Sequence, residues 1–109
     1  MENLISKTPK PPYYAVIFTS IRTVIEHEEY RKMASEMEEA VKSANGFLGM
    51  ETARDTLGIT VSYWKDLESI RAWKAHQAHV EAQQLGKSKW YSTYKTRICL
   101  VERDYDFTL

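Results

Sequence analysis

The sequence predicts an α+β fold in which a four-stranded antiparallel sheet carries two helices on one face. Three observations predict it: four segments rich in β-branched and aromatic residues, two segments with apolar residues at three- and four-residue steps, and their order along the chain. That order is β-α-β-β-α-β, which is typical of the ferredoxin-like arrangement. A chain of 109 residues without an internal repeat is expected to form one such domain.

The first half of the chain supplies an arm, a strand and a helix. Residues 1–12 hold all three prolines and little periodicity, which predicts an extended N-terminal arm before a single domain over residues 13–109. The run YYAVIFTSIR (13–22) predicts a strand that is apolar on both faces. Apolar residues at helical spacing predict the first helix over 27–44, and Asn45-Gly46 supplies a left-handed stop after it.

The second half supplies a hairpin, a helix and a last strand. Residues 47–55 and 57–64 predict two strands joined by a turn at Asp55-Thr56. Asp66 is the expected N-cap of the second helix, and Gly86 is its expected stop. Residues 90–107 predict a long last strand with a charged end.

Charge and composition exclude several classes of protein. Fifteen Lys and Arg balance fifteen Asp and Glu without forming a basic stripe, which disfavours nucleic-acid and anionic-membrane partners. Cys99 is the one cysteine and lies in an apolar run, so we expect a buried thiol, not a nucleophile or a ligand. The N-terminus lacks the pattern of a signal peptide and no window is apolar enough to span a bilayer, so we expect a cytoplasmic protein.

The second face of the predicted sheet needs a cover. The first strand is apolar on both sides, and Ile59, Val61 and Tyr63 add more apolar surface than a wet sheet face usually shows. We therefore predict a homodimer in which two sheets meet face to face.

Four segments, PPYYAVIFTS, NGFLGMETARD, GITVSYWKDLESIRAWKAHQAH and WYSTYKTRICLVERDY, resemble the antibiotic biosynthesis monooxygenase (ABM) domain family over residues 11–107, especially small members of the kind found in bacilli. The resemblance implies a dimeric α/β barrel with one pocket per subunit between sheet and helices. It also implies oxygenation of an aromatic or quinol-like substrate without metal or flavin, because members with known activity do this. A related branch degrades haem, which makes haem the alternative cofactor.

The haem branch uses an Asn on the first strand, a Trp on the second helix and a His about ten residues beyond that Trp. Trp73 matches the Trp, but the His position falls near Gln83 and the first strand has no Asn. Because haem iron needs a specific axial ligand and Gln is a poor one, this departure disfavours haem. His76 or His79 could serve only if the ligand moved by about one helical turn.

The second helix carries the candidate site. On a helical wheel its buried side is predicted to consist of Leu67, Ile70, Trp73 and Val80. His76 lies roughly 60° beyond Trp73 and His79 about 60° farther towards solvent, so His76 is the better pocket histidine. The alternative is that both histidines are ordinary helix-edge side chains. No carboxylate or Cys completes a coordination set with them, so no metal is expected.

Further candidates lie on the strands and near the start of the last strand. Ser62 could point a hydroxyl into the pocket, and Arg97 needs a bound anion or a carboxylate, such as Glu51 or a residue across the dimer. Aromatic side chains could line a slot for a flat ligand, or could be core and interface residues. These aromatics are Trp64, Trp73, Trp90, Tyr91 and Tyr94.

The leading hypothesis is a cofactor-independent monooxygenase acting on an aromatic or quinone-like small molecule. In it His76 deprotonates the substrate, Trp73 stacks on it, and Arg97 or Tyr94 stabilises the anion. The alternatives are a haem-binding or haem-degrading enzyme and a non-catalytic ligand-binding dimer.

Overall fold

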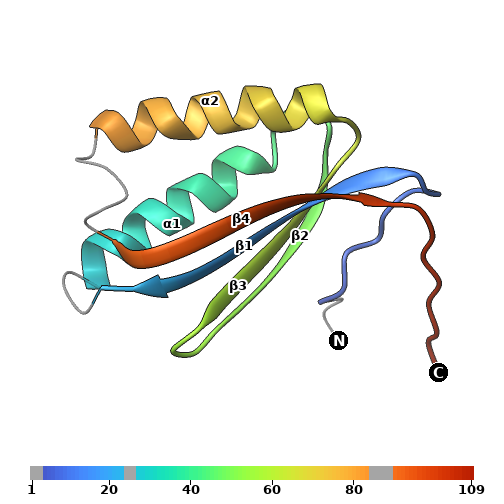
Figure 1. Ribbon diagram of the computed structural model, residues 1–109, viewed down its shortest axis with the longest axis horizontal. Coiled ribbons are helices and arrows are strands. Elements are labelled where there is room, and N and C mark those ends of the chain that lie inside the picture. Colours follow the sequence, from blue (N-terminus) through green and yellow to red (C-terminus); the bar gives the residue numbers. More distant parts are fainter. Residues whose placement is uncertain (1–3, 24–26, 84–89) are drawn as a thin grey trace.

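The computed structural model describes the backbone of residues 4–23, 27–83 and 90–109, and the side chains of these residues except 27 and 80–83. Within these residues the predicted element order is confirmed. The elements are β1 (Tyr13–Arg22), α1 (His27–Val41), β2 (Phe47–Arg54), β3 (Gly58–Trp64), α2 (Leu67–Gln83) and β4 (Tyr91–Val101). Figure 1 shows both helices on one side of the sheet, and the described part of the N-terminal arm and the C-terminal tail on the other side.

The sheet has the strand order β2-β3-β1-β4, and every neighbouring pair is antiparallel. β1 is central, and Val16 stands opposite Ser62 on β3 and Ile98 on β4. Because side chains alternate along a strand, residues in such a row share one face of the sheet. This topology and the two covering helices confirm the predicted ferredoxin-like α+β fold.

The helix ends follow from local chemistry. α1 ends at Val41, before the predicted end at Ala44, because the next residues form a turn in which Ala44 N–H donates to the Val41 carbonyl at 2.9 Å. Gly46 adopts the expected left-handed backbone, with φ of 79°. Asp66 caps α2 as predicted, since its Oδ1 accepts from Ser69 N–H at 2.8 Å. The predicted stop at Gly86 lies outside the described residues.

The core lies between the helices and the sheet. It is built around Val41, Trp64 and Ile70, of which Trp64 is only 1% exposed. The prediction that Leu67 is buried was wrong, because its side chain is 43% exposed. Leu67 is the first residue of α2, and side chains tilt towards the N-terminal end of a helix, so this one extends past the covered part. Cys99 is half-buried, not fully buried as expected.

Both terminal segments bind to the sheet. Ser6 N–H donates to Glu51 Oε2 at 2.9 Å, which ties the arm to β2. Tyr13 OH donates to Asp104 Oδ2 at 2.5 Å and accepts from Thr8 Oγ1 at 3.0 Å. The arm and the C-terminal tail therefore meet at Tyr13, the first residue of β1. The arm therefore lies on this chain's own sheet. No helix in the described ranges is long and apolar enough to cross a membrane.

Candidate functional site

A cavity of about 280 Å³ lies between the helix-side face of the sheet and the two helices. Its size is close to the lower end of the range for small-molecule sites and suits one or two fused rings better than a tetrapyrrole. The lining residues come from every strand, from both helices and from the residue before β4: Val16, Phe18, Tyr30, Met33, Ala34, Met37, Glu38, Val41, Met50, Thr52, Arg54, Thr60, Ser62, Trp64, Ile70, Trp73, Lys74, Gln77, Trp90, Tyr91, Thr96 and Ile98.

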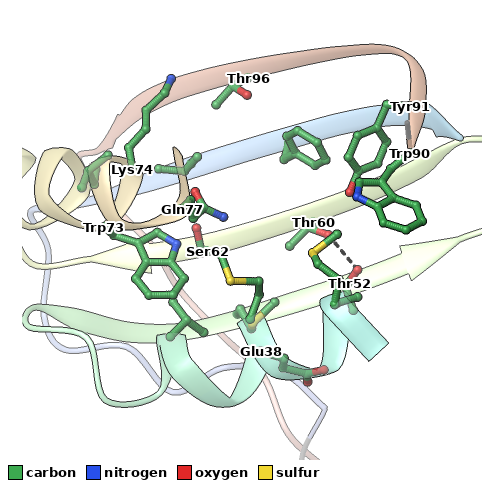
Figure 2. A pocket seen from close by; sticks show the side chains of 18 of the residues that line it. Glu38, Thr52, Thr60, Ser62, Trp73, Lys74, Gln77, Trp90, Tyr91 and Thr96 are labelled. Atoms are coloured by element: carbon green, nitrogen blue, oxygen red, sulfur yellow. Dashed lines mark hydrogen bonds between the residues drawn. The ribbon is translucent and has the colours of Figure 1, made fainter. Parts of the chain in front are cut away.

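Aromatic side chains stand at both ends of this cavity. Figure 2 shows Trp73 of α2 at one end and Trp90 with Tyr91 at the other, with the hydroxyl residues of β2 and β3 between them. Tyr91 lies edge-on to Tyr30 of α1, with 5.9 Å between the ring centroids. The aromatic groups therefore offer flat apolar surface to a planar ligand.

Hydroxyl groups project from the floor of the cavity with hydrogens to spare. Trp64 Nε1–H donates to Ser62 Oγ at 2.9 Å, so the Ser62 hydroxyl is an acceptor in this contact and keeps its own hydrogen for another partner. Thr52 and Thr60 share one hydrogen bond of 2.8 Å between their hydroxyls, which leaves one hydrogen of the pair available. These groups can hold the oxygen atoms of a ligand.

Three charged side chains also line the cavity: Arg54, Lys74 and Glu38. Arg54 Nη2 donates to the hydroxyl of Ser20, which is itself only 1% exposed. No ion pair between these three groups, or between any of them and another described residue, occurs in the structure. Cationic groups thus outnumber carboxylates among the residues that line the cavity.

Most of the predicted pocket residues do meet at this cavity. Ser62, Trp64, Trp73, Trp90 and Tyr91 all line it. Trp64 and Trp90 are 1% and 4% exposed, so these two also act as core residues.

Tyr94 does not line the cavity. Its ring packs against Phe18 on the central strand, with 5.4 Å between centroids, and its side chain is 44% exposed.

His76 does not line the cavity either, which contradicts its predicted role. Its side chain is exposed, and its ring centroid lies 5.2 Å from that of Trp73. The α2 residues that line the cavity are Ile70, Trp73, Lys74 and Gln77. His76 lies roughly 100° from the centre of the helix face that they share, because a helix turns about 100° per residue. His79 is exposed as well.

Arg97 lies on the opposite face of the sheet, so it does not line this cavity, where the sequence had placed it beside a substrate anion. It stands opposite Ile17 on β1, whereas its neighbours Thr96 and Ile98 line the cavity. The expected pairing with Glu51 is also wrong, because two strands separate them and Glu51 accepts from Tyr63 OH at 2.6 Å.

The described lining residues do not fit haem ligated by an imidazole or a thiolate, because none of them is a histidine or a cysteine. The side chain of Gln83, which takes the place of the haem-branch histidine, lies outside what the structure describes. Among the described side chains, no three of His, Cys, Asp and Glu gather as a metal site would require.

Groups with displaced pKa values lie outside the cavity. Burial, together with the hydrogen bond to Glu51, raises the pKa of Tyr63 to about 12. Burial and the hydrogen bond to Asp104 raise the pKa of Tyr13. Hydrogen bonds from the Ser69 hydroxyl and backbone lower the pKa of Asp66. These groups hold the arm, the tail and a helix end in place.

Sequence reasoning missed several polar lining residues that a simple extension of it would have found. Ser62 was predicted, and strand alternation then places Thr60 on the same face. The hairpin register adds Thr52, which stands opposite Thr60. Gln77 and Lys74 were missed because the helical wheel was centred on apolar residues only.

Comparison with known proteins finds one matching family and several solved structures that share this fold. A model of the family described as Monooxygenase af470-like matches residues 16–99. The chain is 42% identical over 106 residues to the uncharacterised protein YqjZ of Bacillus subtilis (strain 168). The alignment covers 94% of this chain and 91% of YqjZ.

Two solved structures share the fold at low sequence identity. PA3566 from Pseudomonas aeruginosa has a TM-score of 0.66 at 14% identity and covers 89% of this chain and 99% of its own. A proposed antibiotic biosynthesis monooxygenase from Chloroflexus aurantiacus J-10-fl has a TM-score of 0.56 at 15% identity and covers 84% of this chain and 97% of its own. At such identities the likeness shows the fold alone.

Proposed function

Because the chain belongs to the Monooxygenase af470-like family, we propose that its cavity binds a small aromatic or quinone-like molecule and directs its oxygenation by O₂. The observation that carries this proposal is the cavity itself, in which aromatic rings stand at both ends and hydroxyl groups with unused hydrogens lie between them. Flat apolar walls with a few polar groups are what a planar phenolic ligand needs.

The proposed reaction balances without an external reductant. A dihydroxynaphthalene and O₂ give a hydroxynaphthoquinone and water: one oxygen atom enters the ring, the ring loses two hydrogen atoms, and the other oxygen atom leaves as water. The substrate supplies all the electrons that O₂ gains. The protein has to orient the substrate, to favour its ionised form and to keep bulk water away.

Two side chains have distinct parts in this proposal. Trp73 is half-buried and lies 6.3 Å from Trp64, centroid to centroid, so it presents a supported ring face to the ligand. Ser62 donates its hydroxyl hydrogen to a substrate oxygen, because this hydrogen is not used in the contact with Trp64 Nε1–H, in which Ser62 Oγ accepts. Charge that develops on that oxygen strengthens such a hydrogen bond.

Oxygen uptake by the purified protein with a panel of dihydroxyaromatics tests the proposal. Ala34→Phe places a ring into the cavity from α1 and should abolish uptake above the buffer background. His76→Ala is the matched control, since an exposed side chain outside the cavity should leave the rate unchanged. Equal rates for the native protein and Ala34→Phe would place the reaction elsewhere or in solution.

We also propose that the protein is a homodimer whose subunits cover each other's helix-free sheet faces. Ile21 and Ile59 on that face are 37% and 41% exposed, and Ile17 and Val61 beside them are only half-buried. Arg97 stands on the same face, where a partner carboxylate could pair with it.

Ile59→Glu should turn the dimer into a monomer in sedimentation experiments, because a carboxylate in place of an apolar interface side chain would have to be desolvated. Thr60→Glu is the matched control on the cavity face. A monomeric native protein would contradict the proposal.

A further inference from the structure

We propose that Arg54 anchors an anionic group of the cavity's ligand, so that the preferred ligands are aromatic acids and not neutral phenols. The inference rests on the proposed function, since it names the substrate class of the same cavity. It is carried by the path of the Arg54 side chain across the sheet, by the hydrogen-bonding capacity that remains on its guanidinium, and by the residues beside it.

The Arg54 side chain crosses a strand to reach the cavity. Arg54 stands opposite Gly58 on β3, and Gly58 stands opposite Ser20 on β1. The guanidinium lies over Gly58 and donates to the Ser20 hydroxyl. A Cβ atom at Gly58 would lie 2.0 Å from Arg54 Nη2 and 2.1 Å from Cζ. The missing side chain of Gly58 is therefore what lets the cation lie flat against the sheet.

This guanidinium has donors to spare. It carries five N–H groups, and the Ser20 hydroxyl accepts from Nη2. Among the described residues no carboxylate lies within 4.0 Å of it, and its side chain is exposed, so a ligand can reach it. A planar guanidinium held in this way matches the two oxygens of a carboxylate.

The neighbouring residues indicate where the rest of the ligand would lie. The next row of the sheet on the same face contains Thr52, Thr60 and Phe18, all of which line the cavity. A ring over Phe18, with its acid group directed to Arg54, would place ring oxygens near the two threonine hydroxyls. Lys74 belongs to α2, so it supplies a second cation from the opposite wall and serves as the control.

Isothermal titration calorimetry with naphthoate and naphthamide tests the inference, because these ligands share shape and differ in charge. The native protein should bind naphthoate about tenfold more tightly than naphthamide, because one charge-assisted hydrogen bond contributes a difference of this size. Arg54→Met should bind both ligands equally. Gly58→Ala should do the same while keeping Arg54, since its new methyl group displaces the guanidinium.

Stability should change little in Gly58→Ala, because Gly58 does not use a left-handed backbone and the clashing atoms end a flexible side chain. Lys74→Met should keep most of the preference for naphthoate. Equal affinities in the native protein would overturn the role of Arg54 and leave the cavity proposal standing. Absence of binding by both ligands would overturn the two proposals together, and loss of the preference in Lys74→Met alone would assign it to the other cation.

Discussion

Gly46→Ala tests what holds the start of α2 in place. The position of this helix matters for the cavity, because α2 forms one of its walls. Gly46 has a φ of 79°, a conformation that costs a residue with a Cβ atom about 1–2 kcal/mol. The added Cβ would lie 2.1 Å from Ser69 Oγ and 2.6 Å from Ser69 Cβ. Ser69 is 4% exposed and takes part in the Asp66 cap, so it cannot simply swing into solvent. Overpacking of this kind costs about 1–3 kcal/mol more.

The two contributions together predict a loss of about 2–5 kcal/mol in the free energy of unfolding. Urea unfolding followed by tryptophan fluorescence and by circular dichroism would measure it. Ser69→Gly removes both clashing atoms, so the double variant should recover about 1–3 kcal/mol of the steric part and none of the backbone part. If the losses in the free energy of unfolding of the two single variants simply add up in the double variant, the clash is refuted. A Gly46→Ala variant as stable as the native protein would refute both contributions.

Two further predictions concern pH. The pKa of Tyr63 is raised from 10.0 to about 12, so between these values the unfolded chain loses this proton while the folded chain keeps it, and stability should fall as pH rises through that window. Tyr63→Phe should be less stable than the native protein near neutral pH, where the hydrogen bond to Glu51 is present, and the difference in urea midpoint should shrink towards about pH 12. An unchanged difference across this range would contradict the assignment. The pKa of Asp66 is lowered from 3.8, so its contribution should be complete above that pH and should disappear as pH falls through the folded value. Asp66→Ala should therefore unfold at a lower temperature near neutral pH and show a weaker fall in stability in acid, whereas a curve parallel to that of the native protein would show that the cap does not act through its charge.

The fold could be predicted because its determinants are local. A few neighbouring residues determine each signal: the alternation along the strands, the Asn45-Gly46 stop and the Asp66 cap. Together these signals predict the β-α-β-β-α-β order of the ferredoxin-like fold. The end of α1 was placed too late because its last turn is continued by i to i+3 hydrogen bonds, which no residue type signals.

The site was predicted only in part, because its polar residues depend on tertiary geometry. The apolar stripe of α2 pointed to Trp73, but the rotation of that helix over the sheet brings Gln77 to the cavity and leaves His76 in solvent. Arg97 was chosen because a cation in an apolar strand is unusual, yet the parity of the strand sends it to the other face. Arg54 was missed because its side chain reaches the cavity across Gly58, a path that needs the hairpin register to be known.

The most direct test of the central claim is the fate of isotopically labelled O₂ during turnover of a dihydroxynaphthalene. Mass spectrometry of the quinone product should show one labelled oxygen atom per molecule formed by the native protein, and the labelled product should disappear with the cavity-filled Ala34→Phe variant. A quinone without label, or labelled product formed at the same rate by both proteins, would contradict the claim that this cavity oxygenates its ligand.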